Sequence, residues 1–173
     1  MLIDVIIADI TEQRVDVVVN AANSSLLGGG GVDGAIHAAA GPALLDECRR
    51  VRRESWPHGL PVGHAVATGA GDLAARWVVH TVGPNRHAGQ TDPALLAACY
   101  RASLDEASRL GATTVAFPAV GAGAYGWDAA TAAEIAVTAV REWDRTQSDS
   151  MITLVRFVLF TPALAHAFTA QVS

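Results

Sequence analysis

The sequence predicts an α/β fold, a three-layer α/β/α sandwich with a mixed central sheet. Short runs of β-branched and apolar residues alternate along the chain with longer segments of helical periodicity, and this alternation is typical of a sheet covered by helices on both faces. The chain has 173 residues, of which 51% are hydrophobic, and contains neither an internal repeat nor a linker. These values are typical of one compact domain, which we expect to cover residues 1–173.

Glycine and proline mark the element boundaries in the first half of the chain. After two apolar strands, Gly41-Pro42 separates two helices, because glycine ends a helix and proline favours the first helical position. Gly71-Asp72 is a turn signal between two further strands. The expected elements are strands at 2–7 and 15–19, helices at 33–40 and 42–53, and strands at 64–70 and 76–82.

The second half continues the alternation. A segment of helical periodicity begins at Pro93 and stops at Gly111, and an apolar strand follows it. A glycine-rich stretch then leads into another helix, and the last strand comes before a short helix that begins after Pro162. The expected elements are helix 93–110, strand 113–119, helix 128–145, strand 152–160 and the short C-terminal helix.

Two glycine-rich loops leave the ends of strands and enter helices: the first glycine loop (residues 28–31) and the second glycine loop (residues 121–126). Glycine lets the backbone approach a ligand closely, and successive N–H groups at a helix N-terminus favour an anion. Ligands of such folds bind beyond the carboxyl ends of the strands. We therefore expect the two loops at one edge of the sheet, where together they would clamp a diphosphate.

The loops do not match two common nucleotide motifs. Neither reads GxxxxGK[ST], and no GxGxxG follows the first strand, which disfavours ATP hydrolysis and a dinucleotide oxidoreductase. On spacing alone, two flexible loops without a ligand remain an alternative.

Charge and composition narrow the function further. The net charge is −5 and the basic residues are all arginine, which argues against nucleic acid as a partner because such binding needs a clustered basic face. Backbone N–H groups would therefore have to hold any bound anion. No residues have the spacing of metal ligands, so we expect neither a metal nor another cofactor. We expect Cys48 and Cys99 to be free buried thiols.

The N-terminus and the hydropathy favour a cytoplasmic protein with no membrane partner. Residues 1–7 have no basic region and no cleavage signal, and they are expected to form a strand. No apolar run approaches the roughly 18 residues of a membrane-spanning helix. A monomer is the default expectation, because no long apolar stripe stands out.

A series of motifs resembles the signature of MacroD-type macrodomains. The series covers nearly the whole chain in order, and its first motif is long and specific. It consists of Asn20-Ala-Ala-Asn23, Gly28-Gly-Gly-Gly-Val-Asp-Gly-Ala-Ile-His37, Ala40-Gly41-Pro42, Gly63-His-Ala, Val79-His-Thr-Val-Gly-Pro84, Phe117-Pro-Ala119 and Tyr125-Gly126.

The resemblance implies a binding site for ADP-ribose and assigns roles along it. Adenine would bind at Asp9 and Ile10 and pack on Phe160, whereas the distal ribose would lie beside Asn23 and Tyr125. The catalytic residues would be Asp33, Asn23 and His37. The residues implied to bind ADP-ribose are Asp9, Ile10, Asn23, Gly30, Gly31, Val32, Gly121, Ala122, Gly123, Ala124, Tyr125, Gly126 and Phe160.

Each assignment has a structural alternative. Asp9 would cap a turn before Thr11, and Asp33 would be a helix N-cap. His37 would be a core histidine held by a backbone carbonyl, and Phe160 would be a core residue. Asn20 is expected to bond loop backbone, and His64 and His80 are expected to be structural.

Four residues at three places depart from the family pattern. Ala8 replaces the glycine that usually precedes the adenine-binding aspartate. Gly121-Ala122 replaces a Ser-Thr pair, so that two hydroxyl contacts are lost while backbone donors remain. Ala38 replaces an arginine that often follows the helix histidine. These changes leave Asn23 and Asp33 in place.

The implied activity is hydrolysis of mono-ADP-ribosyl esters on acidic side chains or of O-acetyl-ADP-ribose, by water activated near Asp33 and the substrate diphosphate. The partners would be ADP-ribose, O-acetyl-ADP-ribose or an ADP-ribosylated protein. The main alternative is a non-catalytic module that reads ADP-ribose. An RNA-binding regulator and a phosphatase acting on ADP-ribose phosphate are further alternatives.

Overall fold

The structure, a computed structural model, describes residues 1–173 and contains one six-stranded sheet. The strand order across the sheet is β1-β6-β5-β2-β4-β3. All neighbours are parallel except β3 and β4, which are antiparallel, so the expected mixed sheet is confirmed. The strands are β1 (Leu2–Ile7), β2 (Val17–Ala22), β3 (Ala65–Gly69), β4 (Trp77–Val82), β5 (Thr114–Phe117) and β6 (Leu154–Leu159).

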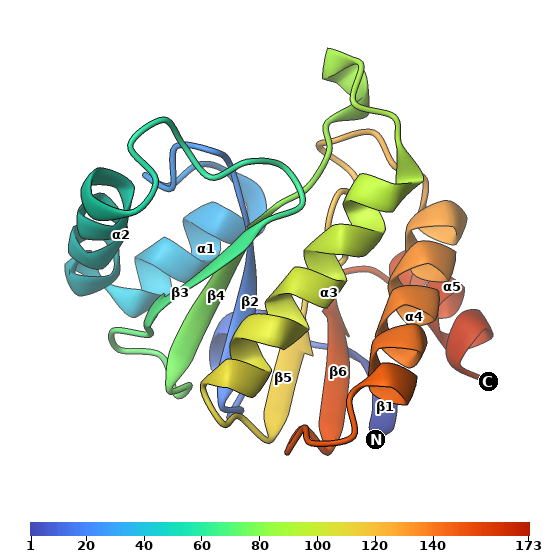
Figure 1. The fold of residues 1–173 in the computed structure, drawn as a ribbon. Coiled ribbons are helices and arrows are strands. Elements are labelled where there is room, and N and C mark those ends of the chain that lie inside the picture. Colours follow the sequence, from blue (N-terminus) through green and yellow to red (C-terminus); the bar gives the residue numbers. More distant parts are fainter.

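Helices cover both faces of the sheet and complete the three expected layers (Figure 1). On one face lie α1 (Gly31–Ala40) and α2 (Pro42–Glu54), and on the other lie α3 (Pro93–Arg109), α4 (Ala129–Thr146) and α5 (Pro162–Val172). Two short 3-10 helices, η1 (Ile10–Glu12) and η2 (Arg86–Ala88), lie in connections. None of the helices has both the length and the apolarity needed to cross a membrane.

The central strands are apolar on both faces because each face is covered. Successive residues of a strand point to opposite faces. Val17 and Val19 accordingly pack beneath α3, α4 and α5, whereas Val18 packs with α1 and α2. Near-continuous apolar runs of this kind are typical of parallel strands buried on both sides.

Some boundaries differ from the expected ones, and one difference matters for the site. β5 ends at Phe117, because Pro118 has no N–H to donate to the next strand. β2 extends to Ala22 instead of residue 19, because Asn20 and Ala21 continue the pairing with β4. Asn20 therefore lies inside the sheet and not in the loop.

The pairing of β2 with β5 brings the two glycine loops together. These strands are parallel neighbours, with Val17 opposite Val115 and Val18 opposite Ala116, so their carboxyl ends lie at the same edge of the sheet. The chain leaves β2 toward the first glycine loop and β5 toward the second. The expectation that both loops share one edge is confirmed.

Candidate functional site

A pocket of about 630 Å³ lies at this edge, between the two glycine loops and the end of β6. Its volume is within the range of small-molecule sites in proteins. The expected ligand-binding residues that line it are Asn23, Gly30, Gly31, Val32, Gly121, Ala122, Ala124, Tyr125 and Phe160, together with the expected catalytic Asp33. Residues not expected from the sequence complete the lining: Ala21, Ala22, Gly29, Pro118, Ala119, Val158, Leu159 and Leu164. The lining does not include Asp9, Ile10, His37, Gly123 or Gly126.

The first glycine loop is held in shape by the side chain of Asn23 and by an anchor in the core. Asn23 Nδ2 donates a hydrogen bond to the Gly28 carbonyl oxygen at 2.9 Å, and its Oδ1 accepts from the N–H of Ser25 at 3.1 Å. Leu26 is 2% exposed and takes a left-handed conformation, with φ of 60°. Non-glycine residues rarely adopt this conformation, so packing of the Leu26 side chain keeps the loop turned toward the sheet.

Two glycines let this loop pass close to the start of α1. A Cβ atom on Gly34 would lie 2.6 Å from the carbonyl oxygen of Gly29. A Cβ atom on Gly29 would lie 3.0 Å from Asp33 Oδ2 and 3.1 Å from Asn23 Nδ2. The side chains of Asn23 and Asp33 therefore converge around Gly29 in the pocket wall, and an alanine there would fit only if these side chains moved by a few tenths of an ångström.

Asp33 lies in the first turn of α1, and the expectation that it caps the helix is wrong. Gly30 is the N-cap residue, with no side-chain cap hydrogen bond, because the helix begins two residues earlier than the expected residue 33. Asp33 is 5% exposed, and its Oδ1 accepts a 2.8 Å hydrogen bond from Asn20 Nδ2. A carboxylate in a first helical turn is favoured by the helix dipole. The hydrogen bond from buried Asn20 therefore fixes the Asp33 carboxylate, which also forms part of the pocket lining.

Asn20 is structural, as expected, but the expected partner is wrong. It is fully buried in β2 and bonds the side chain of Asp33 instead of loop backbone. The longer β2 explains the difference, since Asn20 lies within the strand as the register partner of His80 on β4.

His37 lies one helical turn after Asp33 and faces it. Its Nε2 is 3.4 Å from Asp33 Oδ1, and its side chain is 14% exposed. No backbone carbonyl accepts a hydrogen bond from the ring, so the core-histidine alternative does not hold in that form. Because His37 does not line the pocket, it contacts Asp33 and not the space where a ligand would bind.

A buried polar cluster behind Asp33 was not expected from the sequence to belong to the site. His80 is fully buried, with Asn20 Nδ2 3.1 Å from its Nδ1 and Thr68 Oγ1 2.9 Å from its Nε2. Burial lowers the pKa of His80 to about 3, so the ring is neutral at neutral pH. Cys48 Sγ lies 3.7 Å from Nε2, and burial raises the pKa of that thiol to about 12. As expected, both cysteines are free and buried.

The second glycine loop is fixed mainly by Trp127 and Tyr100. The Trp127 indole donates to the Pro84 carbonyl at 2.9 Å, and the backbone N–H of Val120 donates to the Tyr100 hydroxyl at 3.1 Å. Gly121 has φ of +80°, and a Cβ there would lie 2.9 Å from Trp127 Cδ1. The loop therefore needs glycine at position 121 to close over this indole.

Of the remaining loop residues, some face the pocket and some do not. Ala122, Ala124 and Tyr125 line it, whereas Gly126 lies against His87, whose ring would be 3.1 Å from a Cβ at that position. Within this loop Tyr125 supplies the only side-chain hydroxyl, because alanine and glycine occupy the other positions.

At the opposite end of the pocket, Phe160 is 57% exposed and lines the wall, so the alternative that it is a core residue is wrong. The alternative for Asp9 does hold, since its Oδ1 accepts from the N–H and the hydroxyl of Thr11 at 2.9 and 2.7 Å. Its Oδ2 has no hydrogen-bond partner. Ile10 is 1% exposed and packs in the core beside α1, so only its backbone is available near the site.

The pocket lining contains no arginine, and Asp33 is the only charged residue in it. An anion bound there would be held by backbone N–H groups of the two loops and by the N-terminus of α1. No group of three potential metal ligands occurs in the structure.

Comparison with known proteins agrees with this geometry. The family model for the macro domain matches residues 19–136. The chain is 56% identical over 163 residues to the macro domain-containing protein SCO6450 of Streptomyces coelicolor, covering 94% of each. It is 50% identical over 167 residues to the O-acetyl-ADP-ribose deacetylase of Escherichia coli K12, covering 96% of this chain and 92% of that protein. Among solved structures, an Oceanobacillus iheyensis macrodomain with ADP superimposes with a TM-score of 0.88 at 37% identity, covering 96% of this chain and 87% of that one. The chain belongs to the macrodomain family.

Proposed function

We propose that the protein binds ADP-ribose in the pocket between the glycine loops and hydrolyses O-acetyl-ADP-ribose or mono-ADP-ribosyl esters on acidic side chains. The convergence of Asn23 and Asp33 around Gly29 carries this proposal, because it puts an amide and a carboxylate within about 3 Å of one point on the pocket wall. The name of the Escherichia coli relative supports the choice of an ester of ADP-ribose.

The ligand would lie along the pocket from Phe160 to Asp33. The exposed Phe160 ring offers a face for the adenine base, and Asp9 has a carboxylate oxygen that is free to accept from the adenine amino group. The diphosphate would be held by backbone N–H groups at Gly30, Gly31 and Val32 and across the second glycine loop. The distal ribose would then meet Asn23 and Tyr125.

Asp33 would act as the general base. It orients a water molecule and accepts one proton as the water oxygen bonds to the ester carbonyl carbon. The ester C–O bond then breaks, the ribose oxygen takes up a proton, and the carboxylic acid leaves. With a glycosyl ester the same water would instead reach the anomeric carbon, so that the carboxylate leaves from that carbon. A substrate phosphate oxygen would share the proton in either case.

The decisive experiment compares the wild-type protein with Asp33→Ala on O-acetyl-ADP-ribose and on a glutamate-linked mono-ADP-ribosylated protein. A general base contributes roughly 10²–10⁴-fold, so kcat is expected to fall by about that factor. The affinity for ADP-ribose, measured by calorimetry, is expected to stay within about fivefold, because backbone donors would hold the ligand. Asp46→Ala is the matched control, since that carboxylate is 75% exposed on α2, away from the pocket lining.

Running the reaction in ¹⁸O-labelled water identifies the bond that breaks. Label in the released acid means attack at the carbonyl carbon, whereas an unlabelled acid means attack at the anomeric carbon. Full activity of Asp33→Ala would refute the role of that residue.

A second candidate function is a non-catalytic reader of ADP-ribose, which the absence of side-chain hydroxyls at Gly121 and Ala122 favours. It is identified by ADP-ribose binding with no turnover of either substrate by the wild-type protein. Neither binding nor turnover would refute both functions.

A further inference from the structure

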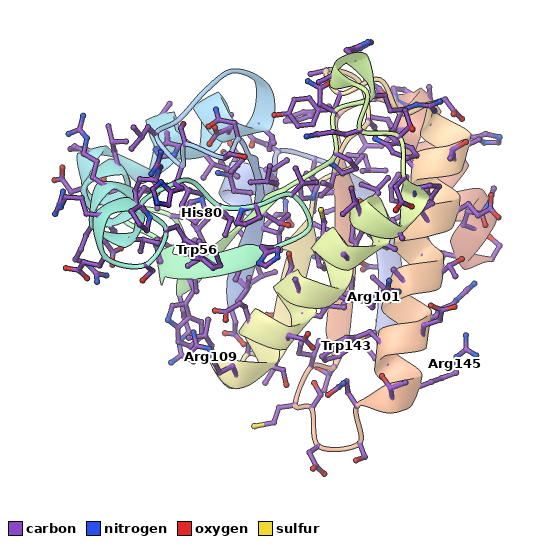
Figure 2. The ribbon with its side chains drawn as sticks, turned by 45° about the horizontal axis from the view of Figure 1, so that its top comes forward. Trp56, His80, Arg101, Arg109, Trp143 and Arg145 are labelled. Atoms are coloured by element: carbon purple, nitrogen blue, oxygen red, sulfur yellow. The ribbon has the colours of Figure 1, made fainter.

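We propose that His80 is a positioning residue that fixes the side-chain amide of Asn20, and through it the carboxylate of Asp33, for the reaction. Figure 2 shows His80 on the side of the sheet that α1 and α2 cover. The importance of Asp33 for turnover rests on the proposed function, whereas the arrangement of His80 and Asn20 can be tested without it.

The amide of Asn20 lies between two acceptors. Its Nδ2 is 2.8 Å from Asp33 Oδ1 and 3.1 Å from His80 Nδ1, and Asn20 and His80 are direct register partners on β2 and β4. An amide nitrogen carries two hydrogens, so each acceptor can receive one. Asn20 Oδ1 is buried and has no partner. The orientation of the amide is therefore set from its nitrogen side alone.

A reversed amide would be unfavourable in this position. It would place the Asn20 oxygen against the carboxylate of Asp33, where two acceptors would face each other without a hydrogen. Asn20 and His80 are fully buried, so no solvent relieves such a contact.

The hydrogen bonds of Thr68 determine which nitrogen of His80 carries the proton. Thr68 Oγ1 lies 2.9 Å from the Gly69 carbonyl oxygen and 2.9 Å from His80 Nε2. The single hydroxyl hydrogen goes to the carbonyl, which cannot donate. Oγ1 then accepts from Nε2–H, so Nδ1 is bare and accepts from Asn20. Thr68 on β3 thus fixes the tautomer of the His80 ring, and this tautomer fixes the orientation of the Asn20 amide.

The surroundings of His80 keep this tautomer. The titratable groups that face it are Asp33 and His37 on α1 and Cys48 on α2. The high pKa of Cys48, about 12, leaves its thiol uncharged, and the His37 ring centroid is 6.5 Å away. Among these groups only Asp33 bonds the Asn20 amide, so the chain of hydrogen bonds ends at the carboxylate that faces the pocket.

Two substitutions of His80 separate positioning from packing. In His80→Asn the new Oδ1 occupies the place of Nδ1 and still accepts from Asn20. In His80→Gln the longer side chain reaches toward Thr68 but offers no acceptor at the Nδ1 position. Both variants remove a buried ring, and His80→Asn removes more volume than His80→Gln, so a role in packing alone would not make His80→Gln the more damaging of the two.

We expect kcat of His80→Gln to fall about tenfold while the Kd for ADP-ribose changes less than about twofold, and His80→Asn to recover kcat to within about threefold of wild type. Thermal unfolding of both variants reports their stability. Equal loss of kcat in the two variants, or unchanged kcat in His80→Gln, would overturn the proposal.

A measurement on the wild-type protein tests the arrangement of His80 and Asn20 even if both variants unfold, or if the protein binds ADP-ribose without hydrolysing it. The ¹⁵N shifts of the His80 ring are expected to show protonated Nε2 and bare Nδ1 at neutral pH. A ring protonated at Nδ1 would overturn the positioning role. Absence of turnover by wild type with the expected tautomer would instead count against the proposed hydrolase and leave the arrangement of His80 and Asn20 supported.

Discussion

Acidification should destabilise the protein through His80, and the size of the effect follows from its burial. The ring is fully buried, and its pKa falls from 6.5 to about 3 because burial disfavours the charged form. The unfolded chain exposes the same ring and protonates it near pH 6.5. Between these values the unfolded state binds more protons than the folded state, so stability falls as pH falls. The contribution is fully present above about pH 6.5 and decreases below it.

The magnitude is about 1.4 kcal/mol for each pH unit below 6.5. At about pH 5 the loss reaches about 2 kcal/mol, a large share of the stability of a single domain. The shifted carboxylates act at lower pH. The pKa of Asp16 is lowered below 3.8, mainly by the backbone N–H of Thr113, so its contribution is present above 3.8 and is lost only under stronger acid.

Urea unfolding at about pH 7 and about pH 5 measures the effect, with His80→Asn as the matched variant that does not titrate in this range. Wild type is expected to lose about 2 kcal/mol more than the variant over this interval. Equal losses in the two proteins would refute the reasoning, because they would mean that the folded state protonates His80 as readily as the unfolded state does.

Two further predictions concern the loops. Gly34→Ala places a Cβ 2.6 Å from the Gly29 carbonyl and should cost about 1–3 kcal/mol and weaken ADP-ribose binding, whereas Gly30→Ala, whose Cβ would meet no atom within 4 Å, should change urea stability by less than about 1 kcal/mol. Equal stability of these two variants would contradict the steric argument. Tyr100→Phe removes one of the two acceptors of the Val120 N–H, the other being the Pro118 carbonyl oxygen at 3.0 Å, and should cost about 0.5–1.5 kcal/mol in thermal or urea unfolding, with a weaker affinity for ADP-ribose in calorimetry. An unchanged affinity would show that Tyr100 does not shape the second glycine loop.

Much of the fold was predictable because its signals are local. Gly41-Pro42 separates α1 from α2 as expected, and the antiparallel β3–β4 pair matches the turn signal between them. The strand order was not predictable in the same way, since it depends on which apolar segments pair across the sheet. β2 reaches Ala22 because β4 offers partners to Asn20 and Ala21, and the apolar run alone does not show this.

The resemblance to macrodomains pointed to residues that the structure brings together. Residue type and spacing alone would not have distinguished these site residues from residues with a purely structural role. Asn23, Asp33, Tyr125 and Phe160 line one pocket, although one helix position and three positions in connecting segments far apart in the sequence supply them. By residue type and position alone, capping a helix was the favoured role of Asp33. In the structure α1 begins at Gly31, so Asp33 lies inside the first turn and its side chain accepts a hydrogen bond from Asn20.

The sequence alone does not connect His80 with the pocket, because its neighbours on the same face of the strand are apolar. On the face of β4 that packs against α1 and α2 it stands between Val78 and Val82, and a lone buried histidine among valines has many structural explanations. A central parallel strand seldom carries a fully buried asparagine as well. The two are register partners, so each provides what the other lacks: Asn20 has a hydrogen to donate and His80 has a bare nitrogen. A polar residue at matching depth in two neighbouring strands is thus the signal that sequence analysis can use, provided that the strand pairing is known first.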